Sequence, residues 1–153
     1  DPLAGLREMR RVARRRAVVL TLDPEAIRDF WFYDYFPEIA LADAQRFPSI
    51  DAITRTLGGD VRVEVVPIPH DCRDGFLAAY WRRPSAYLAS HVRRNISTLA
   101  ALGDDDLLDG LARLADDVRS GVWDLANFWL TERQELDLGY RLVVAEYGDP
   151  VTK

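Results

Sequence analysis

The sequence of 153 residues carries a formal net charge of −5, and 48% of its residues are hydrophobic. This length is enough for one domain with a sizeable core, and such a composition excludes an intrinsically disordered chain. The acidic balance argues against a general nucleic-acid-binding protein, which needs a basic face. The lone cysteine, Cys72, excludes an internal disulfide and a cysteine cluster for zinc.

No apolar run approaches the roughly 20 residues that a membrane-spanning helix needs, and no segment has the pattern of a signal peptide. We therefore expect a cytoplasmic protein without a membrane partner. Basic charge is concentrated near the start of the chain, at Arg7, Arg10, Arg11, Arg14, Arg15 and Arg16. This placement fits a solvated helix face with favourable positive charge toward the helix C-terminus.

The first segments have the order helix, strand, helix. Apolar side chains recur on one helical face between Leu3 and Ala13, which predicts an amphipathic helix. Ala17–Leu22 is a short apolar run rich in β-branched residues, typical of a strand buried on both faces of a parallel sheet. Asp23 followed by Pro24 predicts the start of a helix, with the aspartate as its N-cap.

The expected helix Pro24–Phe36 is aromatic on nearly every face. A surface helix keeps one face polar, so two interpretations stay open. The helix is buried on several sides, or it covers an apolar cavity. In either case Pro37 ends it, because proline interrupts helical hydrogen bonding.

Two short helices and a strand follow. We expect helices at Glu38–Gln45 and at Ile50–Leu57, the second capped by Ser49 and ended by a pair of glycines. Val61–Val66 alternates valines with charged residues, which predicts a half-buried strand near a sheet edge. Pro67 follows it, and proline cannot donate to a strand ladder.

A polar turn, His70–Asp74, comes after this strand. We expect Asp74 to cap a helix that ends with Arg82 and Arg83, where positive charge suits the helix terminus. Pro84 halts that helix.

Further helices extend to about residue 130. One is expected to be capped by Ser90 and ended by Gly103, and the next, opened by an acidic triplet, is ended by Gly121. Tyr140–Tyr147 has a clear strand pattern. The elements predict an α/β protein, with residues 1–153 as one domain. Residues 70–138 would form a mainly helical insertion of the kind that supplies substrate caps in α/β enzymes.

Several blocks of the sequence resemble class I S-adenosylmethionine-dependent methyltransferases. The opening LREMRRVARRRAVVLTLDP resembles the helix and fifth strand of that family. The blocks FP-x-I, VPIPHDCRDGFLAAYWRRP and ELDLGYRLVVAEY resemble the carboxyl-terminal portion of a bacterial small-molecule branch of the same family. The resemblance extends from Leu3 to Tyr147.

This resemblance implies a partial Rossmann-like methyltransferase sheet. Val18–Asp23 would be the fifth strand and Val61–Val66 the sixth, with Tyr140–Tyr147 inserted antiparallel between them as the seventh. Arg14 to Arg16 stand where the family usually has Pro-Gly-Gly, so the turn differs. The family's glycine-rich donor loop and its acidic partner are absent, and they would lie upstream of Asp1.

The stretch Val61–Pro84 is the expected acceptor side of a methyl-transfer site. His70 is the candidate catalytic base, because imidazole exchanges protons near neutral pH, and Asp71 and Asp74 would orient it or act themselves. Aromatic side chains would contact a flat substrate, and an aromatic box favours a sulfonium cation. The candidate substrate-binding residues are Trp31, Tyr35, Asp74, Tyr80 and Trp81.

Structural interpretations of these residues stay open. His70 would then be a turn histidine that satisfies backbone groups, Asp74 a helix cap, and Cys72 a small buried hydrophobic residue. We expect no metal site. Consecutive residues such as His70, Asp71 and Cys72 chelate poorly, and no second ligand cluster accompanies them.

The sequence therefore predicts the substrate-recognition portion of a methyltransferase that acts on a small molecule. S-adenosylmethionine would belong to the complete enzyme, and this chain alone would bind none and be inactive. The alternative is a non-catalytic domain that keeps the fold for interaction or small-molecule binding. We also expect self-association through strand 18–22, whose edge lacks the family's neighbouring strand.

Overall fold

A computed structural model describes residues 1–148, and these residues form two compact units. The first unit comprises Asp1–Arg28, Ala42–Val66 and residues 139–148, and the second comprises Asp29–Leu41 and Pro67–Leu138. The expected insertion at 70–138 falls within the second unit, which also takes in Asp29–Leu41.

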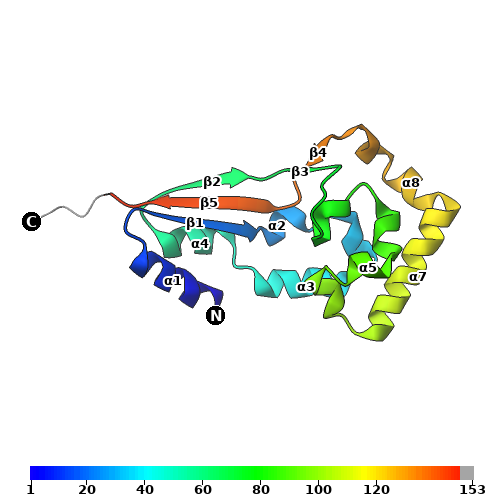
Figure 1. The fold of residues 1–153 in the computed structure, drawn as a ribbon, viewed down its shortest axis with the longest axis horizontal. Coiled ribbons are helices and arrows are strands. Elements are labelled where there is room, and N and C mark those ends of the chain that lie inside the picture. The colour runs from blue at the N-terminus through cyan, green and yellow to red at the C-terminus, as the bar shows by residue number, and fades with distance from the viewer. Residues whose placement is uncertain (149–153) are drawn as a thin grey trace, which may run out of the picture. The chain divides into compact units, whose positions relative to one another are not determined.

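The first unit contains a sheet in the order β1–β5–β2 (Figure 1). These strands are β1 (Arg16–Leu22), β5 (Tyr140–Glu146) and β2 (Asp60–Val65). β5 runs antiparallel to both of its neighbours, so β1 and β2 are parallel to each other. This arrangement confirms the predicted insertion of the last strand, antiparallel, between the two earlier ones.

Helices α1 (Pro2–Val12) and α4 (Ile50–Leu57) belong to the same unit, and both begin at polar caps. The Asp1 carboxylate accepts a hydrogen bond from the Leu3 N–H at 3.0 Å. Ser49 Oγ accepts one from the Ala52 N–H at 3.3 Å, as expected from the sequence. Such a cap satisfies amide groups that have no partner within the helix. α4 ends at Gly58, which has a φ of 57°. The unit also holds α2 (Pro24–Ile27).

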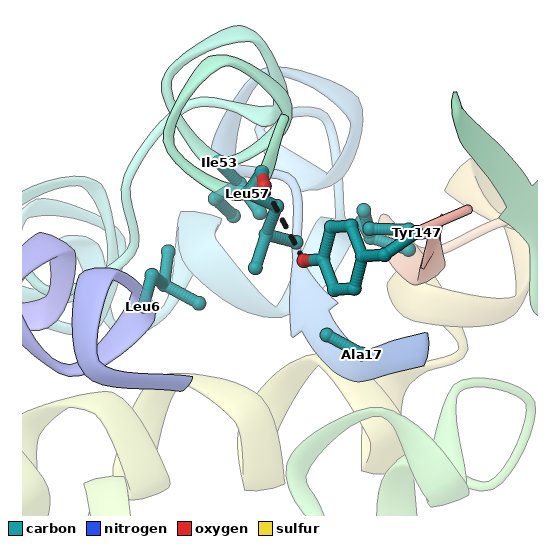
Figure 2. Packing of buried hydrophobic residues seen from close by; sticks show 7 residues of the cluster. Leu6, Ala17, Ile53, Leu57 and Tyr147 are labelled. Atoms are coloured by element: carbon teal, nitrogen blue, oxygen red, sulfur yellow. Dashed lines mark hydrogen bonds between the residues drawn. The ribbon is translucent and has the colours of Figure 1, made fainter. Parts of the chain in front are cut away.

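The core of this unit lies between one face of the sheet and the helices α1 and α4 (Figure 2). Its buried members are Leu6, Ala17, Ile53, Leu57, Val143, Ala145 and Tyr147. The Tyr147 hydroxyl donates a 3.3 Å hydrogen bond to the carbonyl of Leu57, so the one polar atom of that ring is satisfied. Burying a leucine or isoleucine side chain contributes about 1.5–3 kcal/mol, which makes this cluster a main source of stability for the unit.

β1 is not buried on both faces, contrary to the prediction from its apolar run. Ala17 is buried, whereas Val18 is 50% exposed and Leu20 is 62% exposed. Side chains alternate between the faces of a strand, and the core cluster takes Ala17 and Val19 from one face, while Leu22 at the end of the other face is also buried. The other face therefore leaves two apolar β1 side chains in contact with solvent.

The second unit is mainly helical and joined by short connections. Its largest helix is α7 (Asp104–Ser120), which begins after Gly103 and ends at Gly121 with a φ of 79°, as expected. β3 (Ile68–Pro69) and β4 (Glu135–Leu136) form a small antiparallel pair. The remaining elements are η1 (Trp31–Asp34), η2 (Leu77–Tyr80), η3 (Pro84–Leu88), α5 (Ser90–Arg93), α6 (Ser97–Ala100), α8 (Val122–Ala126) and η4 (Phe128–Glu132). α3 (Pro37–Arg46) includes residues of both units.

The predicted helix Pro24–Phe36 is wrong as a continuous element. α2 ends at Ile27, and Phe30 has an extended backbone before the 3₁₀ helix η1 begins. An unbroken helix presents side chains in every direction and cannot bury all of them in one core. The break allows the rings of Phe30, Trp31, Phe32, Tyr33 and Phe36 all to be at least nine-tenths buried. Of the two interpretations, the structure favours core packing.

Two other helix predictions are also corrected. Residues 74–83 contain only the single 3₁₀ turn η2, and Asp74 accepts a hydrogen bond from the adjacent Gly75 N–H instead of capping a helix. The helix expected from Ser90 to Gly103 is divided into α5 and α6, and Ser90 provides no side-chain cap. Within residues 1–148, no helix has the length and apolar character needed to cross a bilayer.

Candidate functional site

The predicted site lies on a tight turn, Ile68–Asp74, which we call the His70 turn. The β3–β4 pairing places Ile68 opposite Leu136. The His70 N–H then donates to the carbonyl of Gln134 at 2.9 Å, and the Cys72 N–H donates to the carbonyl of Pro69 at 3.1 Å. The first of these bonds joins the turn to the residue that precedes β4, and the second closes the turn on itself.

Three consecutive residues hold alternate positions of this turn. Trp81 Nε1 donates to the carbonyl of Ile68 at 3.0 Å. Arg82 Nη2 lies 2.8 Å from Nδ1 of His70. Arg83 Nη2 donates to the carbonyl of Cys72 at 2.6 Å. The two ends of the PHDC…YWRRP block therefore contact each other, and three side chains of its second end support the turn.

The polar candidates differ in how they are held. His70 is half-buried, and its ring contacts Arg82. Asp71 and Asp74 are exposed, and one carboxylate oxygen of Asp74 accepts a hydrogen bond from the Gly75 N–H at 2.8 Å. Cys72 is half-buried with a free thiol. The turn therefore presents one imidazole and two carboxylates to solvent, and it can offer both hydrogen-bond donors and acceptors to a ligand.

Two of the aromatic candidates are packed in the interior. Trp81 is completely buried and Trp31 is 7% exposed. Nε1 of Trp31 donates to the Trp81 carbonyl at 2.8 Å, and its ring meets that of Trp123 edge to face at 5.1 Å. These rings have almost no surface to offer a ligand. They support the residues around them.

Tyr80 is half-buried and keeps part of its ring accessible. The guanidinium of Arg83 lies 4.9 Å from the centre of that ring, and Tyr87 packs edge to face on it at 5.6 Å. Among the aromatic candidates near the His70 turn, Tyr80 is the one placed to contact a flat ligand.

Tyr35 has a structural partner. Its hydroxyl donates to the carboxylate of Asp117 on α7 at 2.7 Å. Partial burial raises the pKa of Tyr35 well above its usual range, and the hydrogen bond to Asp117 adds to this effect. The hydroxyl is therefore neutral at physiological pH, and its proton is already donated in the hydrogen bond to Asp117.

Sequence reasoning missed the roles of Arg82 and Arg83, which it placed at a helix end. Arg82 Nη1 also donates to the carbonyls of Thr131 and Arg133, at 3.1 and 2.9 Å. An arginine fork can satisfy several carbonyls at once, which a lysine cannot do with the same geometry. The carbonyl groups that these arginines bind lie up to 51 positions away in the sequence, so no local pattern shows the contacts. The signal that could have indicated them is the pair of arginines directly after a buried tryptophan.

A surface hollow of about 590 Å³ adjoins the same arginines. Its lining residues are Arg82, Arg83, Pro84, Ser85, Val118, Trp123, Asp124 and Thr131. The Nε1 atom of Trp123 is buried and has no hydrogen-bond partner within residues 1–148. An unpaired buried donor carries a desolvation cost of about 1–3 kcal/mol, so this N–H group offsets part of the stability gained by burying the indole ring.

No strand of residues 1–148 leads into a helix through a glycine-rich turn. A donor site needs close backbone approach at a glycine-rich turn between a strand and a helix. β1 leads into α2 through Asp23 and Pro24, and β2 is followed by Pro67, so neither offers such a turn. Among residues 1–148 there is also no group of three or more His, Cys, Asp or Glu side chains suited to a metal ion.

One solved structure matches this chain closely. It is a proposed methyltransferase from an antibiotic biosynthesis pathway of Anabaena variabilis ATCC 29413, with a TM-score of 0.84 and 34% sequence identity. The fold is methyltransferase-like. The likeness covers 95% of this chain and 60% of that one, so this chain spans less than two thirds of the length of its neighbour. No family model matches the sequence, and no curated protein does. The likeness supports a methyltransferase-type function.

Proposed function

We propose that this chain is the substrate-recognition portion of an S-adenosylmethionine-dependent methyltransferase that acts on a small molecule. The observation that carries the proposal is the β1–β5–β2 sheet, in which an antiparallel last strand separates two parallel ones. The likeness to a proposed methyltransferase over 95% of the chain supports it. The proposed setting is a bacterial, cytoplasmic enzyme.

In this proposal the donor-binding half of the enzyme lies outside the chain. No described strand leads into a helix through a glycine-rich turn, and the structural neighbour has sequence beyond the part that this chain matches. S-adenosylmethionine would supply the methyl group in the complete enzyme. We assign no residue of this chain to it.

The acceptor side would be built on the His70 turn. His70 and Asp71 are the proposed catalytic residues, and Asp74 and Tyr80 are proposed to contact the small molecule. Of the remaining candidates, Trp31 and Trp81 are buried and would shape the site from beneath, while the Tyr35 hydroxyl bonds to Asp117. Methyl transfer requires alignment of acceptor and donor, which a rigidly held turn provides.

The free edge of β1 is the proposed place of attachment for further structure. In the described residues β1 pairs only with β5. The Tyr147 N–H bonds to the Arg15 carbonyl and the Asp23 N–H to the Gly139 carbonyl, so odd-numbered residues of β1 face β5. The backbone groups of Val18 and Leu20 therefore point to the open edge. For this chain alone, we propose that a second copy pairs there.

Calorimetry with S-adenosylmethionine tests the main proposal. We expect no measurable binding to this chain alone. We expect binding once the chain is co-expressed with the part of the Anabaena protein that it does not match. Tight binding of S-adenosylmethionine to the chain alone would overturn the view that the donor half lies elsewhere.

The second candidate is a non-catalytic domain that keeps the fold for interaction. The open, apolar edge of β1 favours it, because exposed strand edges recruit partners. The genomic sequence upstream of the Asp1 codon separates the two. A strand, glycine-rich turn and helix encoded there supports the enzyme, and a start codon next to Asp1 supports the interaction domain.

A further inference from the structure

The ring of His70 is held by a guanidinium whose position does not depend on the histidine. Nη1 of Arg82 donates to the carbonyls of Thr131 and Arg133, at 3.1 and 2.9 Å. Because the guanidinium is planar and rigid, these two bonds fix the direction in which Nη2 points. Nη2 lies 2.8 Å from Nδ1 of His70.

This contact determines where the ring carries its proton. A guanidinium can only donate hydrogen bonds, so Nδ1 of His70 must accept one. An imidazole that accepts at Nδ1 is neutral and carries its single proton on Nε2. Protonation at Nδ1 would bring two donors together and break the contact with Arg82.

The Nε2–H group is left as a donor without a partner among residues 1–148. His70 is half-buried, and within residues 1–148 its ring makes no second hydrogen bond. Its backbone N–H is already bonded to the Gln134 carbonyl at 2.9 Å, so the residue has little freedom to swing away. The ring therefore presents a fixed donor and no free lone pair.

We propose that His70 binds the substrate as a hydrogen-bond donor through Nε2–H, and that Arg82 is the positioning residue that holds it in this state. This inference rests on the proposed function and makes it more specific. The substrate would present an acceptor oxygen, such as a carboxylate or carbonyl, to His70. A cationic amine is disfavoured, because both Nε2–H and the guanidinium of Arg82 repel it.

The proposal also changes the division of roles within the turn. A general base needs a free lone pair, and the neutral ring of His70 has none while Arg82 is bound. The exposed carboxylate of Asp71, the next residue, can accept a proton. Proton removal from the acceptor is accordingly assigned to Asp71, and substrate anchoring to His70.

The tautomer is measurable by NMR on the full 153-residue chain labelled with ¹⁵N-histidine. Long-range ¹H–¹⁵N correlations distinguish the Nδ1–H form from the Nε2–H form. The chain has two histidines, so a His91→Gln variant assigns the signals. We expect the neutral His70 ring to be almost wholly in the Nε2–H form. A substantial Nδ1–H population would overturn the proposal.

Arg82→Met removes the donor and should raise the Nδ1–H fraction of His70. Arg83→Met is the matched control, because it removes the same charge and contacts the same turn at Cys72 without touching the ring. An unchanged tautomer ratio in Arg82→Met would overturn the positioning role. If that variant fails to fold, the wild-type spectrum still tests the Nε2–H state of His70, because it requires no substitution.

The substrate class is tested with benzoate and benzylamine, which share a flat ring and differ in the polar group. We expect benzoate to shift the His70 ring signals and benzylamine to leave them in place, with His91 as the internal reference. A response to benzylamine alone, or to neither probe, would overturn the acceptor-oxygen assignment. The tautomer does not depend on methyl transfer, so failure of the proposed function in calorimetry is distinguishable from failure of this inference.

Discussion

The hydroxyl of Tyr35 donates a hydrogen bond to the carboxylate of Asp117, 2.7 Å away on α7. Arg113 strengthens the same junction, because its guanidinium donates to the carbonyls of Asp34 and Tyr35 at 3.0 and 2.6 Å. Two side chains of α7 thereby bond to Asp34 and Tyr35 and attach the C-terminal end of η1 to α7. The role of Tyr35 in this structure is to hold that junction.

Replacing Tyr35 by phenylalanine removes the bond and leaves the Asp117 carboxylate without that donor. We expect a loss of about 1–3 kcal/mol in the free energy of unfolding at pH 7, the usual cost of breaking a hydrogen bond to a charged group. Urea denaturation followed by fluorescence measures it. A Tyr35→Phe chain as stable as the wild type would show that the junction does not depend on this hydroxyl.

The same pair should make stability pH-dependent in alkaline solution. The pKa of Tyr35 is raised in the folded state, so above about pH 10 the unfolded chain loses this proton first. Stability contributed by the neutral hydroxyl is fully present below pH 10 and declines as the pH rises further. The stability difference between wild type and Tyr35→Phe should therefore shrink above pH 10. A constant difference up to pH 11 would contradict this.

Gly110 allows α7 to lie directly against the aromatic segment. A Cβ atom at this position would overlap the ring of Phe36 and lie 2.7 Å from the Tyr35 carbonyl oxygen. Alanine is better than glycine in a helix by about 1 kcal/mol, but an overlap with backbone cannot be relieved cheaply. We expect Gly110→Ala to destabilise the chain by about 1–3 kcal/mol in thermal or urea unfolding.

Gly5 in α1 provides the matched control. A Cβ there meets no atom within 4 Å, so the propensity gain should appear without a clash. Gly5→Ala is expected to stabilise the chain by about 0.5–1 kcal/mol. If both substitutions stabilise, the close approach at Gly110 is not a constraint.

Strands and capped helices were predictable because their signals are local. β-branched residues marked β1, β2 and β5, with a proline following each of the first two, and Ser49 with the following glycines marked both ends of α4. The antiparallel last strand came from the resemblance. No local pattern distinguishes it from a parallel one.

The second unit was predicted less well, also for physical reasons. Aromatic residues at 30–36 have no helical period, so the sequence does not reveal the extended Phe30 that divides α2 from η1. Asp74 has the residue type of a cap, but its carboxylate bonds to the neighbouring amide. The contacts that organise the His70 turn, such as Arg82 with Thr131, join residues far apart in sequence. Only the packed chain shows them.

Two buried tryptophans should respond differently to the same substitution. Nε1 of Trp81 donates to the Ile68 carbonyl at 3.0 Å, whereas Nε1 of Trp123 has no partner in the part of the chain that the structure describes. Trp81→Phe removes a hydrogen bond to a buried carbonyl, while Trp123→Phe removes an unpaired donor. We expect Trp81→Phe to cost about 1–3 kcal/mol more than Trp123→Phe in urea unfolding. Equal losses would show that ring volume alone determines the effect.

The free edge of β1 should govern association of the chain with itself. Val18 and Leu20 are 50% and 62% exposed, and their backbone groups face away from β5. An exposed apolar strand edge pairs readily with another strand, and a lysine on it opposes that pairing. We expect the wild type to associate as its concentration rises and Leu20→Lys to remain monomeric, as measured by light scattering. Leu125→Lys is the control, because Leu125 is 78% exposed on α8 and lies on no strand. If Leu125→Lys abolishes association and Leu20→Lys does not, the interface involves α8 instead of the edge of β1. A wild type that stays monomeric at high concentration would rule out pairing at either place.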